Sequence, residues 1–432
     1  MSVTLRLDLT NVMQSSVGRN HGISEAQLGG LQRRTRRIHE SLQRRRQAGE
    51  LAFYDLPYMR ESIIEVMSFA GEQIGRFENY VHVGSGGSSL GARALHGALN
   101  HPFHNYFPEK ERGGYPRLFF IDRLDPDTLS GLLAVIDPRR TLFHIVSKSG
   151  REPQINTGFL FLLAALKKRV GPNWRAQVIF TTDPENGDLH ALARAERIKV
   201  FAIHPMVGER FLALSPAGII PAVLSGTDVH GLLHGAIEMD GACRQVDIYK
   251  NPAYLFGAAH FLLDTLKGKS QAKMLAGADC LAGMASWFQF VWDFRPARKI
   301  HHRDSIDKII NAARWGEQAK SAGSASQAAG NLAISFLLTE KFRHDTALTE
   351  ELPQQIGFQA IGKPSAHQVV KTEHRVFSEA LIAARCPHLA ITFPKVRPES
   401  VGEFVYMMHV AVTYTSALQE MVAAERLAIA KG

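Results

Sequence analysis

The sequence predicts an α/β protein whose core is a parallel β-sheet packed between layers of helices. Short β-rich runs alternate with helical stretches through the middle of the chain, which is the order that parallel βαβ units produce. Two of these runs end in turns rich in glycine or serine, at the edge where such sheets bind their ligands. The 432 residues are enough for two or three domains.

The first 50 residues are predicted to form a helical segment. Ser24 and Gln27 make a capping-box start, and apolar residues then recur every three or four positions up to Leu42. Seven arginines and one glutamate between Arg33 and Arg46 give this stretch a net charge of +6. We interpret it as a packed helix with a solvated basic face. The alternative, a surface for an anionic partner such as RNA, lacks interleaved aromatic residues.

Five strands and the helices between them are predicted for the middle of the chain. The strands end in small or turn-forming residues, and the helices between them have apolar faces. The predicted strands are Tyr80–Val83, Leu118–Ile121, Leu142–Val146, Val178–Thr181 and Val200–Ile203, and the helices are Pro153–Lys168 and Asp188–Glu196.

A helix-rich region is predicted after Gly226. It contains one clear strand candidate, His388–Phe393, and a polar stretch typical of a loop, Lys320–Gln327. The predicted helices are Tyr254–Leu266, Ala285–Trp292, Ala328–Leu338, Ala366–Ala384 and Glu399–Ala424.

Composition excludes several classes of protein. With 45% hydrophobic and 21% charged residues, the chain is not expected to be disordered. No apolar run approaches the ~20 residues of a membrane span, so no membrane partner is expected. Taking the +6 of the arginine stretch from the total of +9 leaves only +3, so nucleic acid is not an expected partner either. Three scattered cysteines and the lack of a signal-peptide pattern predict a cytoplasmic location.

The strongest local signal is the glycine-rich turn from Gly84 to Gly91, which follows a predicted strand and opens a helix. Its sequence GSGGSSLG is neither a dinucleotide-binding turn nor a P-loop. Glycine lets backbone N–H groups approach a ligand, and a helix N-terminus favours negative charge. The turn therefore predicts an anion site, although a tight turn without a ligand explains the same residues.

Two further segments strengthen the prediction of an anion site. Ser147, Lys148 and Ser149 follow a strand, and two hydroxyls with a lysine suit a phosphate. Later in the chain, Arg210 precedes an apolar stretch and would add a second positive charge beside the site.

These three segments, in this order, resemble the glucose-6-phosphate isomerase family, whose pattern runs GIGGSxLG, SKSGGTxET and GGRFSxLSPxGLLPAA. The resemblance covers nearly the whole chain. Further similar segments are Asp55-Leu56-Pro57, Trp287-Phe288-Gln289, Glu373–Ala384, Pro387-His388-Leu389 and the stretch from Gly402 onward.

The resemblance implies two doubly wound sugar-isomerase domains, at 51–230 and 231–432, the second with C-terminal helices. It also implies a homodimer that interconverts glucose 6-phosphate and fructose 6-phosphate without a metal or an organic cofactor. In the family a histidine helps to open the sugar ring and a glutamate moves a proton between C1 and C2. An arginine and a lysine stabilise the enediolate, the anion that forms in between.

Residue by residue, the first part of the site matches the family. The implied phosphate-binding residues are Gly86, Gly87, Ser88, Ser147, Lys148 and Ser149, and Arg210 matches the arginine that stabilises the enediolate. The family threonine after this serine turn is replaced by Glu152, a carboxylate that would repel a phosphate or occupy its place. Arg151 could offset this charge by pairing with Glu152 or could supply a replacement phosphate contact.

The acid–base residues of the family are replaced in this sequence. The glutamate position falls on Phe294, the histidine position on Ala328 and the lysine position on Ala428. Substitutes would have to come from elsewhere, and the candidates are Asp293, His301, Glu373 and Lys431. The adjacent pair His301 and His302 is interpreted as a surface pair, because neighbouring residues point apart, and no metal site is expected.

Two functions remain open at this point. One is an aldose–ketose isomerase for sugar phosphates, and the other is a catalytically silent paralogue that binds a phosphosugar or another small anion. An interaction protein that uses the basic helix is a third and weaker alternative.

Overall fold

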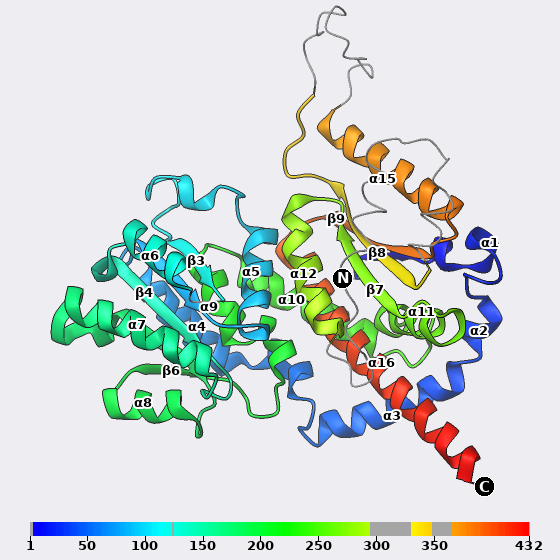
Figure 1. Cartoon of the computed structure of the whole chain (residues 1–432), viewed down its shortest axis with the longest axis horizontal. Helices are drawn as coiled ribbons and strands as arrows, with labels where there is room; N and C mark the ends of the chain where they lie inside the picture. The colour runs from blue at the N-terminus through cyan, green and yellow to red at the C-terminus, as the bar shows by residue number, and fades with distance from the viewer. Residues whose placement is uncertain (1–2, 123–124, 294–329, 348–364, 432) are drawn as a thin grey trace, which may run out of the picture.

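The computed structural model describes residues 3–122, 125–293, 330–347 and 365–431, and contains two β-sheets with helices around each (Figure 1). The first sheet has five parallel strands in the order β3-β2-β4-β5-β6. The predicted α/β class is therefore confirmed. The strands are β2 (Asn79–Val83), β3 (Arg117–Ile121), β4 (Thr141–Val146), β5 (Val178–Thr182) and β6 (Lys199–Ala202).

Helices cover both faces of the first sheet (Figure 1). The central strands β2, β4 and β5 are buried along their whole length, as expected for a sheet packed on both sides. The helices on one face are α4 (Arg60–Gln73), α5 (Gly87–Leu99) and α9 (Pro216–Leu224), and those on the other are α6 (Pro126–Val135), α7 (Pro153–Val170) and α8 (Asp188–Glu196).

The strand order places a topological switch point between β2 and β4. From β2 the chain goes first to β3 on one side, and then returns to β4 on the other. The connections after β2 and β4 therefore leave on opposite faces of the sheet, and a crevice opens between them at the carboxyl ends of the strands. The glycine-rich turn follows β2 and the serine turn follows β4, so both flank this crevice.

The second sheet has four strands in the order β1-β9-β8-β7, of which β7, β8 and β9 are parallel. Its strands are β1 (Arg6–Asp8), β7 (Gln271–Ala276), β8 (Leu332–Lys341) and β9 (His388–Lys395). The helices of this half are α10 (Val229–Cys243), α11 (Pro252–Lys267), α12 (Ala282–Asp293), α15 (Ala366–Ala383) and α16 (Pro398–Lys431).

One predicted helix is a strand. The prediction for Ala328–Leu338 is wrong over its described part, because Leu332–Lys341 forms β8 in the middle of the second sheet. The first six residues of β8 are all buried and five of them are apolar, so apolar side chains lie on both sides of the strand. Periodicity does not separate such a run from a buried helix. The predicted loop Lys320–Gln327 lies outside the described residues.

The N-terminal segment is helical apart from its first strand. The capping box of Ser24 and Gln27 is confirmed at the start of α2 (Glu25–Gly29), after α1 (Gln14–Val17) and before α3 (Gln32–Gln47). Sequence reasoning missed β1, which pairs antiparallel with β9. The boundaries at residues 50 and 230 stay predictions.

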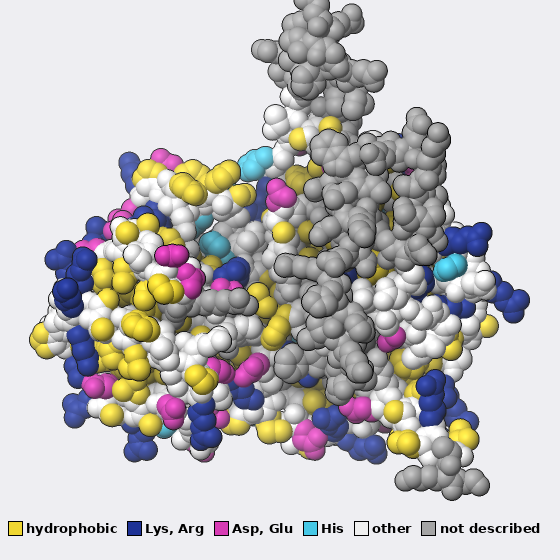
Figure 2. Space-filling model, viewed as in Figure 1, with side chains coloured by type: hydrophobic (Ala, Val, Ile, Leu, Met, Phe, Trp, Pro, Cys, Tyr) yellow, Lys and Arg dark blue, Asp and Glu magenta, His cyan; other side chains and the backbone are white. Residues whose placement is uncertain are grey.

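The basic helix α3 packs through Thr35, Ile38 and Leu42 and turns its arginines outward, apart from Arg46, which is only 11% exposed. Several of these arginines pair with carboxylates, Arg34 with Glu425 and Arg45 with Glu50. Figure 2 shows dark blue and magenta side chains mixed along the lower margin, where α3 runs in Figure 1. The packed face of this helix is therefore as predicted.

A buried carboxylate connects the N-terminal segment to the C-terminal helix. Asp240 of α10 is 1% exposed and accepts hydrogen bonds from Arg46 (2.7 Å), Tyr406 (2.6 Å), Tyr58 (2.7 Å) and Arg244 (2.7 Å). Burial by itself would raise the pKa of Asp240, but these four donors outweigh it and lower the pKa.

A helix that crosses a bilayer needs about 20 consecutive apolar residues. Among the helices that the structure describes, none combines this length with the required apolar character.

Candidate functional site

The two predicted turns open at the same edge of the first sheet. β2 and β4 are parallel neighbours, with Val83 opposite Ile145. A Cβ atom on Gly84 would lie only 3.2 Å from the carbonyl oxygen of Val146, so the two chain ends touch as they leave the sheet. The prediction that both turns share one end of one parallel sheet is confirmed.

Glycine is required in the turn after β2. Gly86 has a φ of +52°, which disfavours residues with a side chain. A Cβ atom on Gly87 would lie 2.1 Å from the carbonyl oxygen of Glu209 and 3.2 Å from the ring of Phe290. The turn is therefore enclosed by the third predicted segment, at Glu209, and by α12, at Phe290.

A chain of buried side chains lies beneath this turn. His82 Nε2 faces the Ser88 carbonyl oxygen at 2.7 Å and must donate, so its Nδ1 accepts from the Tyr80 hydroxyl at 3.2 Å. Tyr80 has one proton to give, so it accepts from His144 Nδ1 at 2.5 Å, and His144 Nε2 accepts from Thr181 at 2.6 Å. Burial lowers the pKa of His82 to about 4. The neutral histidines thus hold the first turn of α5 against the sheet.

The serine turn is held by the neighbouring strand. The Ser147 N–H donates to the Thr181 carbonyl oxygen at 3.1 Å, and the Lys148 carbonyl oxygen accepts from the Asp183 N–H at 3.1 Å. The Ser147 side chain is buried, whereas Ser149 is exposed. We call Gly86, Gly87, Ser88, Ser147, Lys148 and Ser149 the anion site.

The two serine hydroxyls of the anion site donate hydrogen bonds to Glu152. It is the N-cap residue of α7, one position before the first helical residue Pro153. Its side chain does not cap the helix, and its two carboxylate oxygens accept from the hydroxyls of Ser147 and Ser149 instead. Glu152 thus contacts the two serine side chains that are predicted to bind a phosphate.

Sequence reasoning missed a second carboxylate, Glu209, at the start of the 3-10 helix η6 (Glu209–Leu214). Partial burial raises the pKa of Glu209, the charge of Glu152 and a hydrogen bond with it raise the pKa further, and Lys148 opposes this shift. A signal was present in the sequence, because the family pattern GGRF reads GERF here. This signal could be interpreted only with the structure, because Glu209 interacts with Glu152, which lies 57 residues earlier in the chain.

The two arginines proposed for the site differ in their surroundings. The guanidinium of Arg210 lies 5.6 Å from the ring centre of Phe211, and burial lowers the pKa of Arg210. Arg151 is exposed, and its backbone N–H donates to Ser149 Oγ at 3.2 Å. Among the described residues no ion pair joins Arg151 to Glu152, so Arg151 does not offset the charge of Glu152 by pairing with it.

The candidate acid–base residues are spread over the molecule. Asp293 ends α12, one turn after Phe290, and accepts from Gln289 at 2.5 Å. Glu373 is exposed on α15, which packs on the second sheet. Ala428 is exposed near the end of α16. The C-terminal end of α16 lies on the opposite side of the view from α7 (Figure 1). The positions Phe294, His301 and Ala328, and the side chain of Lys431, lie outside what the structure describes.

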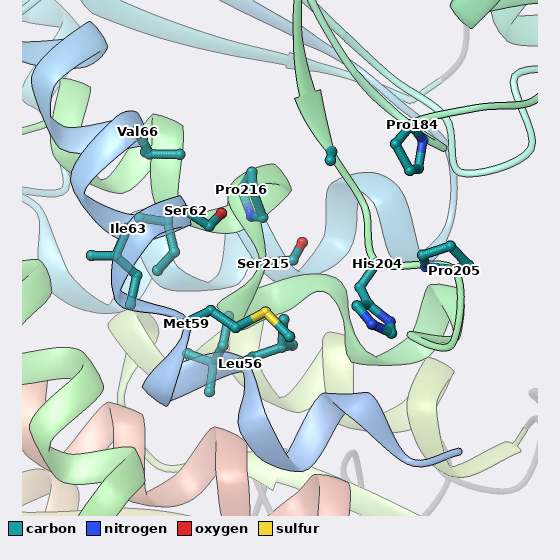
Figure 3. Close-up of a pocket in the computed structure, with 13 residues that line it drawn as sticks. Leu56, Met59, Ser62, Ile63, Val66, Pro184, His204, Pro205, Ser215 and Pro216 are labelled. Carbon is teal, nitrogen blue, oxygen red and sulfur yellow. The ribbon is translucent and has the colours of Figure 1, made fainter. Parts of the chain in front are cut away.

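A pocket of about 220 Å³ lies at the carboxyl end of the edge strand β6 (Figure 3). Its wall is mostly apolar, and none of its lining residues belongs to the anion site. The pocket is therefore separate from the predicted anion site. The labelled lining residues are Leu56, Met59, Ser62, Ile63, Val66, Pro184, His204, Pro205, Ser215 and Pro216.

Protein sites for metal ions are commonly built from His, Cys, Asp and Glu side chains. Within the part of the chain that the structure describes, no three such side chains are grouped so that they could hold a metal ion.

The fold defines a doubly wound α/β protein whose predicted anion site lies at its switch point. A profile of the phosphoglucose isomerase family matches residues 56–329. A glucose-6-phosphate isomerase of Carboxydothermus hydrogenoformans is 32% identical over 435 residues, covering 100% of this chain and 93% of the relative. One of Rubrobacter xylanophilus is 41% identical over 221 residues, about half of each chain. The chain belongs to the phosphoglucose isomerase family.

Solved structures agree with this fold. A hypothetical protein from Thermus thermophilus superposes with a TM-score of 0.77 at 24% identity, covering 98% of this chain and all of that one. A glucose-6-phosphate isomerase from Chlamydia trachomatis superposes with a TM-score of 0.65 at 17% identity, covering 89% and 75%. These likenesses concern the fold alone.

Lys148→Ala is expected to weaken binding of sulfate or a sugar phosphate by about 1–2 kcal/mol, the range for a charge-assisted hydrogen bond. Lys168→Ala, which removes an exposed lysine near the end of α7, is the matched control and should leave the affinity unchanged. Titration calorimetry at two salt concentrations measures both, and the wild-type affinity should fall with salt. Equal affinities of the two variants would exclude Lys148 from the anion site.

Proposed function

We propose that this protein is an aldose–ketose isomerase that interconverts glucose 6-phosphate and fructose 6-phosphate. One observation carries the proposal. The three segments that match the family, centred on Gly87, Ser147 and Glu209, meet at one crevice although about 60 residues separate each from the next. Relatives that bear the name of this activity support it.

The proposed roles follow from the chemistry of the side chains. Lys148 and the hydroxyls of Ser147 and Ser149 hold the phosphate, together with the N–H groups at the start of α5. Arg210 supplies positive charge where the enediolate forms. Asp293 is the proposed base, because it lies one helical turn beyond Phe290, whose ring borders the glycine turn.

A coupled assay for fructose 6-phosphate tests the proposal. The wild-type protein should convert glucose 6-phosphate, and Lys148→Ala should raise KM more than it lowers kcat, because it removes a contact to the non-reacting phosphate. Binding of the sugar phosphate without any conversion, at enzyme concentrations comparable to the substrate, would refute isomerase activity.

The second candidate function is binding without turnover. It is favoured by the contacts of Glu152, whose carboxylate takes both hydroxyls of the anion site. It is also favoured by the residues at the family's acid–base positions, Phe294, Ala328 and Ala428. Binding measured beside the assay separates the two candidates.

The remaining proposals concern assembly and compartment. We propose a homodimer, as the family resemblance implies, and sedimentation velocity at several concentrations tests it. The cytoplasm remains the proposed compartment because all three cysteines, Cys243, Cys280 and Cys386, are free thiols.

A further inference from the structure

Four side chains form a continuous series of hydrogen bonds through the sheet beneath the anion site. His82 Nε2 donates to the Ser88 carbonyl oxygen at 2.7 Å, and the Tyr80 hydroxyl lies 3.2 Å from His82 Nδ1. The same hydroxyl lies 2.5 Å from His144 Nδ1, and His144 Nε2 lies 2.6 Å from the Thr181 hydroxyl. His82, Tyr80, His144 and Thr181 are each 0% exposed. We call these four side chains the buried network.

The two ends of the buried network hold the two turns of the anion site. At one end, Ser88 belongs to the glycine turn and lies in the first turn of α5. At the other end, the backbone carbonyl oxygen of Thr181 accepts from the Ser147 N–H at 3.1 Å, where the serine turn leaves β4. The network therefore links the two turns through side chains of β2, β4 and β5.

The donors and acceptors of the network have one consistent arrangement. A backbone carbonyl can only accept, so the proton of His82 is on Nε2, and Nδ1 accepts from Tyr80. Tyr80 has one proton to give, so His144 donates to it from Nδ1 and accepts from Thr181 at Nε2. Burial lowers the pKa of both histidines, so both are neutral and they have opposite tautomers. Within the network, Tyr80 is the residue that joins the two histidines.

The backbone between the two turns has no side chain that could fix their separation. The turns approach each other at Gly84, where a Cβ atom would lie 3.1 Å from the Ser88 carbonyl oxygen and 3.2 Å from the Val146 carbonyl oxygen. Without such an atom, the hydrogen bonds of the buried network supply the fixed spacing.

We propose that Tyr80 is a positioning residue of the anion site. Its hydroxyl joins His82 to His144, and the network thereby holds the glycine turn and the serine turn at the separation that a tetrahedral dianion requires. Tyr80 does not touch the anion itself. Binding groups must be held to within about 0.5 Å of their productive positions, so a small shift of one turn is enough to weaken binding. This role rests on the proposed function only in using the same anion site.

Tyr80→Phe tests the proposal, because it removes the hydroxyl and keeps the ring. Inorganic sulfate is the probe, since it has the shape and charge of a phosphate group and carries no sugar. We expect the affinity for sulfate, measured by titration calorimetry, to fall about three- to tenfold, the equivalent of one buried hydrogen bond.

Tyr254→Phe is the matched control. Tyr254 lies in α11, is 1% exposed, and its hydroxyl is likewise bonded to a histidine, His39, at 3.0 Å. Both substitutions should lower the midpoint of urea-induced unfolding, but only Tyr80→Phe should weaken sulfate binding. A network with a merely structural role would lower the midpoint and leave the affinity of both variants unchanged.

Substitutions of Thr181 test the other end of the network and replace Tyr80→Phe if that variant does not fold. Thr181→Ser keeps the hydroxyl and should retain the wild-type affinity, whereas Thr181→Val should weaken sulfate binding. The losses of Tyr80→Phe and Thr181→Val should not add in the double variant, because both interrupt the same network. Nitrogen NMR of the wild type should show the proton of His82 on Nε2 and that of His144 on Nδ1.

Four results would each overturn the inference. These are an unchanged affinity in Tyr80→Phe, equal affinities of Thr181→Val and Thr181→Ser, additive losses in the double variant, or no sulfate binding by the wild type. The result is separable from the proposed function. Sulfate binding that depends on Tyr80, without conversion of glucose 6-phosphate, would refute the isomerase and leave the role of Tyr80 standing.

Discussion

Glu152→Thr is expected to increase the affinity for glucose 6-phosphate by about 1–3 kcal/mol. The substitution removes a negative charge from the anion site and releases the hydroxyls of Ser147 and Ser149, which are not available to a phosphate while they donate to Glu152. The new threonine also adds a hydroxyl at the position where the family has one. Titration calorimetry of both proteins with glucose 6-phosphate measures the change.

Glu152→Gln is the matched control for this prediction. It keeps the size of the side chain and removes the charge, so it should recover the part of the gain that comes from lost repulsion. An affinity of Glu152→Thr equal to or below that of the wild type would show that Glu152 does not compete with the phosphate. Arg151 would then be the first candidate for a compensating contact.

The same variant separates the two candidate functions. If the wild type is an isomerase limited by its occupied anion site, Glu152→Thr should lower KM and leave kcat nearly unchanged. If the protein only binds, the affinity rises and no fructose 6-phosphate forms, because Phe294, Ala328 and Ala428 supply no acid–base groups.

Asp240→Asn is expected to lower the free energy of unfolding by about 3–5 kcal/mol, the cost of breaking a buried ion pair from one side. The amide keeps the shape of the side chain but removes the buried charge that pairs with Arg46, itself only 11% exposed, and leaves it with Asp55, which is 43% exposed. The loss should be cooperative across the chain, since Asp240 joins α3, α10 and α16. The midpoint and slope of urea-induced unfolding measure this loss of stability.

A surface pair provides the control for Asp240. Arg34 and Glu425 are 40% and 37% exposed, so Glu425→Gln should cost at most about 1 kcal/mol. The lowered pKa of Asp240 means that its stabilisation is present above the unfolded pKa of about 3.9 and is lost as the pH falls through the native value. The wild type should therefore lose stability in acid more steeply than Asp240→Asn. If Asp240→Asn and Glu425→Gln lowered the free energy of unfolding equally, this account of Asp240 would be wrong.

Much of the fold was predictable from the sequence by itself, because the relevant signals are local. Alternating β-rich and helical runs predicted the five strands of the first sheet, and α8 has the predicted bounds Asp188–Glu196. Helix-capping residues located the start of α2 at Ser24. Glycine and serine after strands located the two turns of the anion site, since the residues of a turn decide its backbone conformation.

Only the tertiary structure decided what depends on partners distant in sequence. β8 is a strand because it fills the middle of the second sheet, where its apolar run is buried between β7 and β9. β1 forms because β9 offers it an open edge. The interaction of Glu209 with Glu152 likewise has no local signal, because β2, β4 and η6 must first bring their ends to one crevice. Burial and charge act between neighbours in space, and a sequence read along the chain does not show which residues those are.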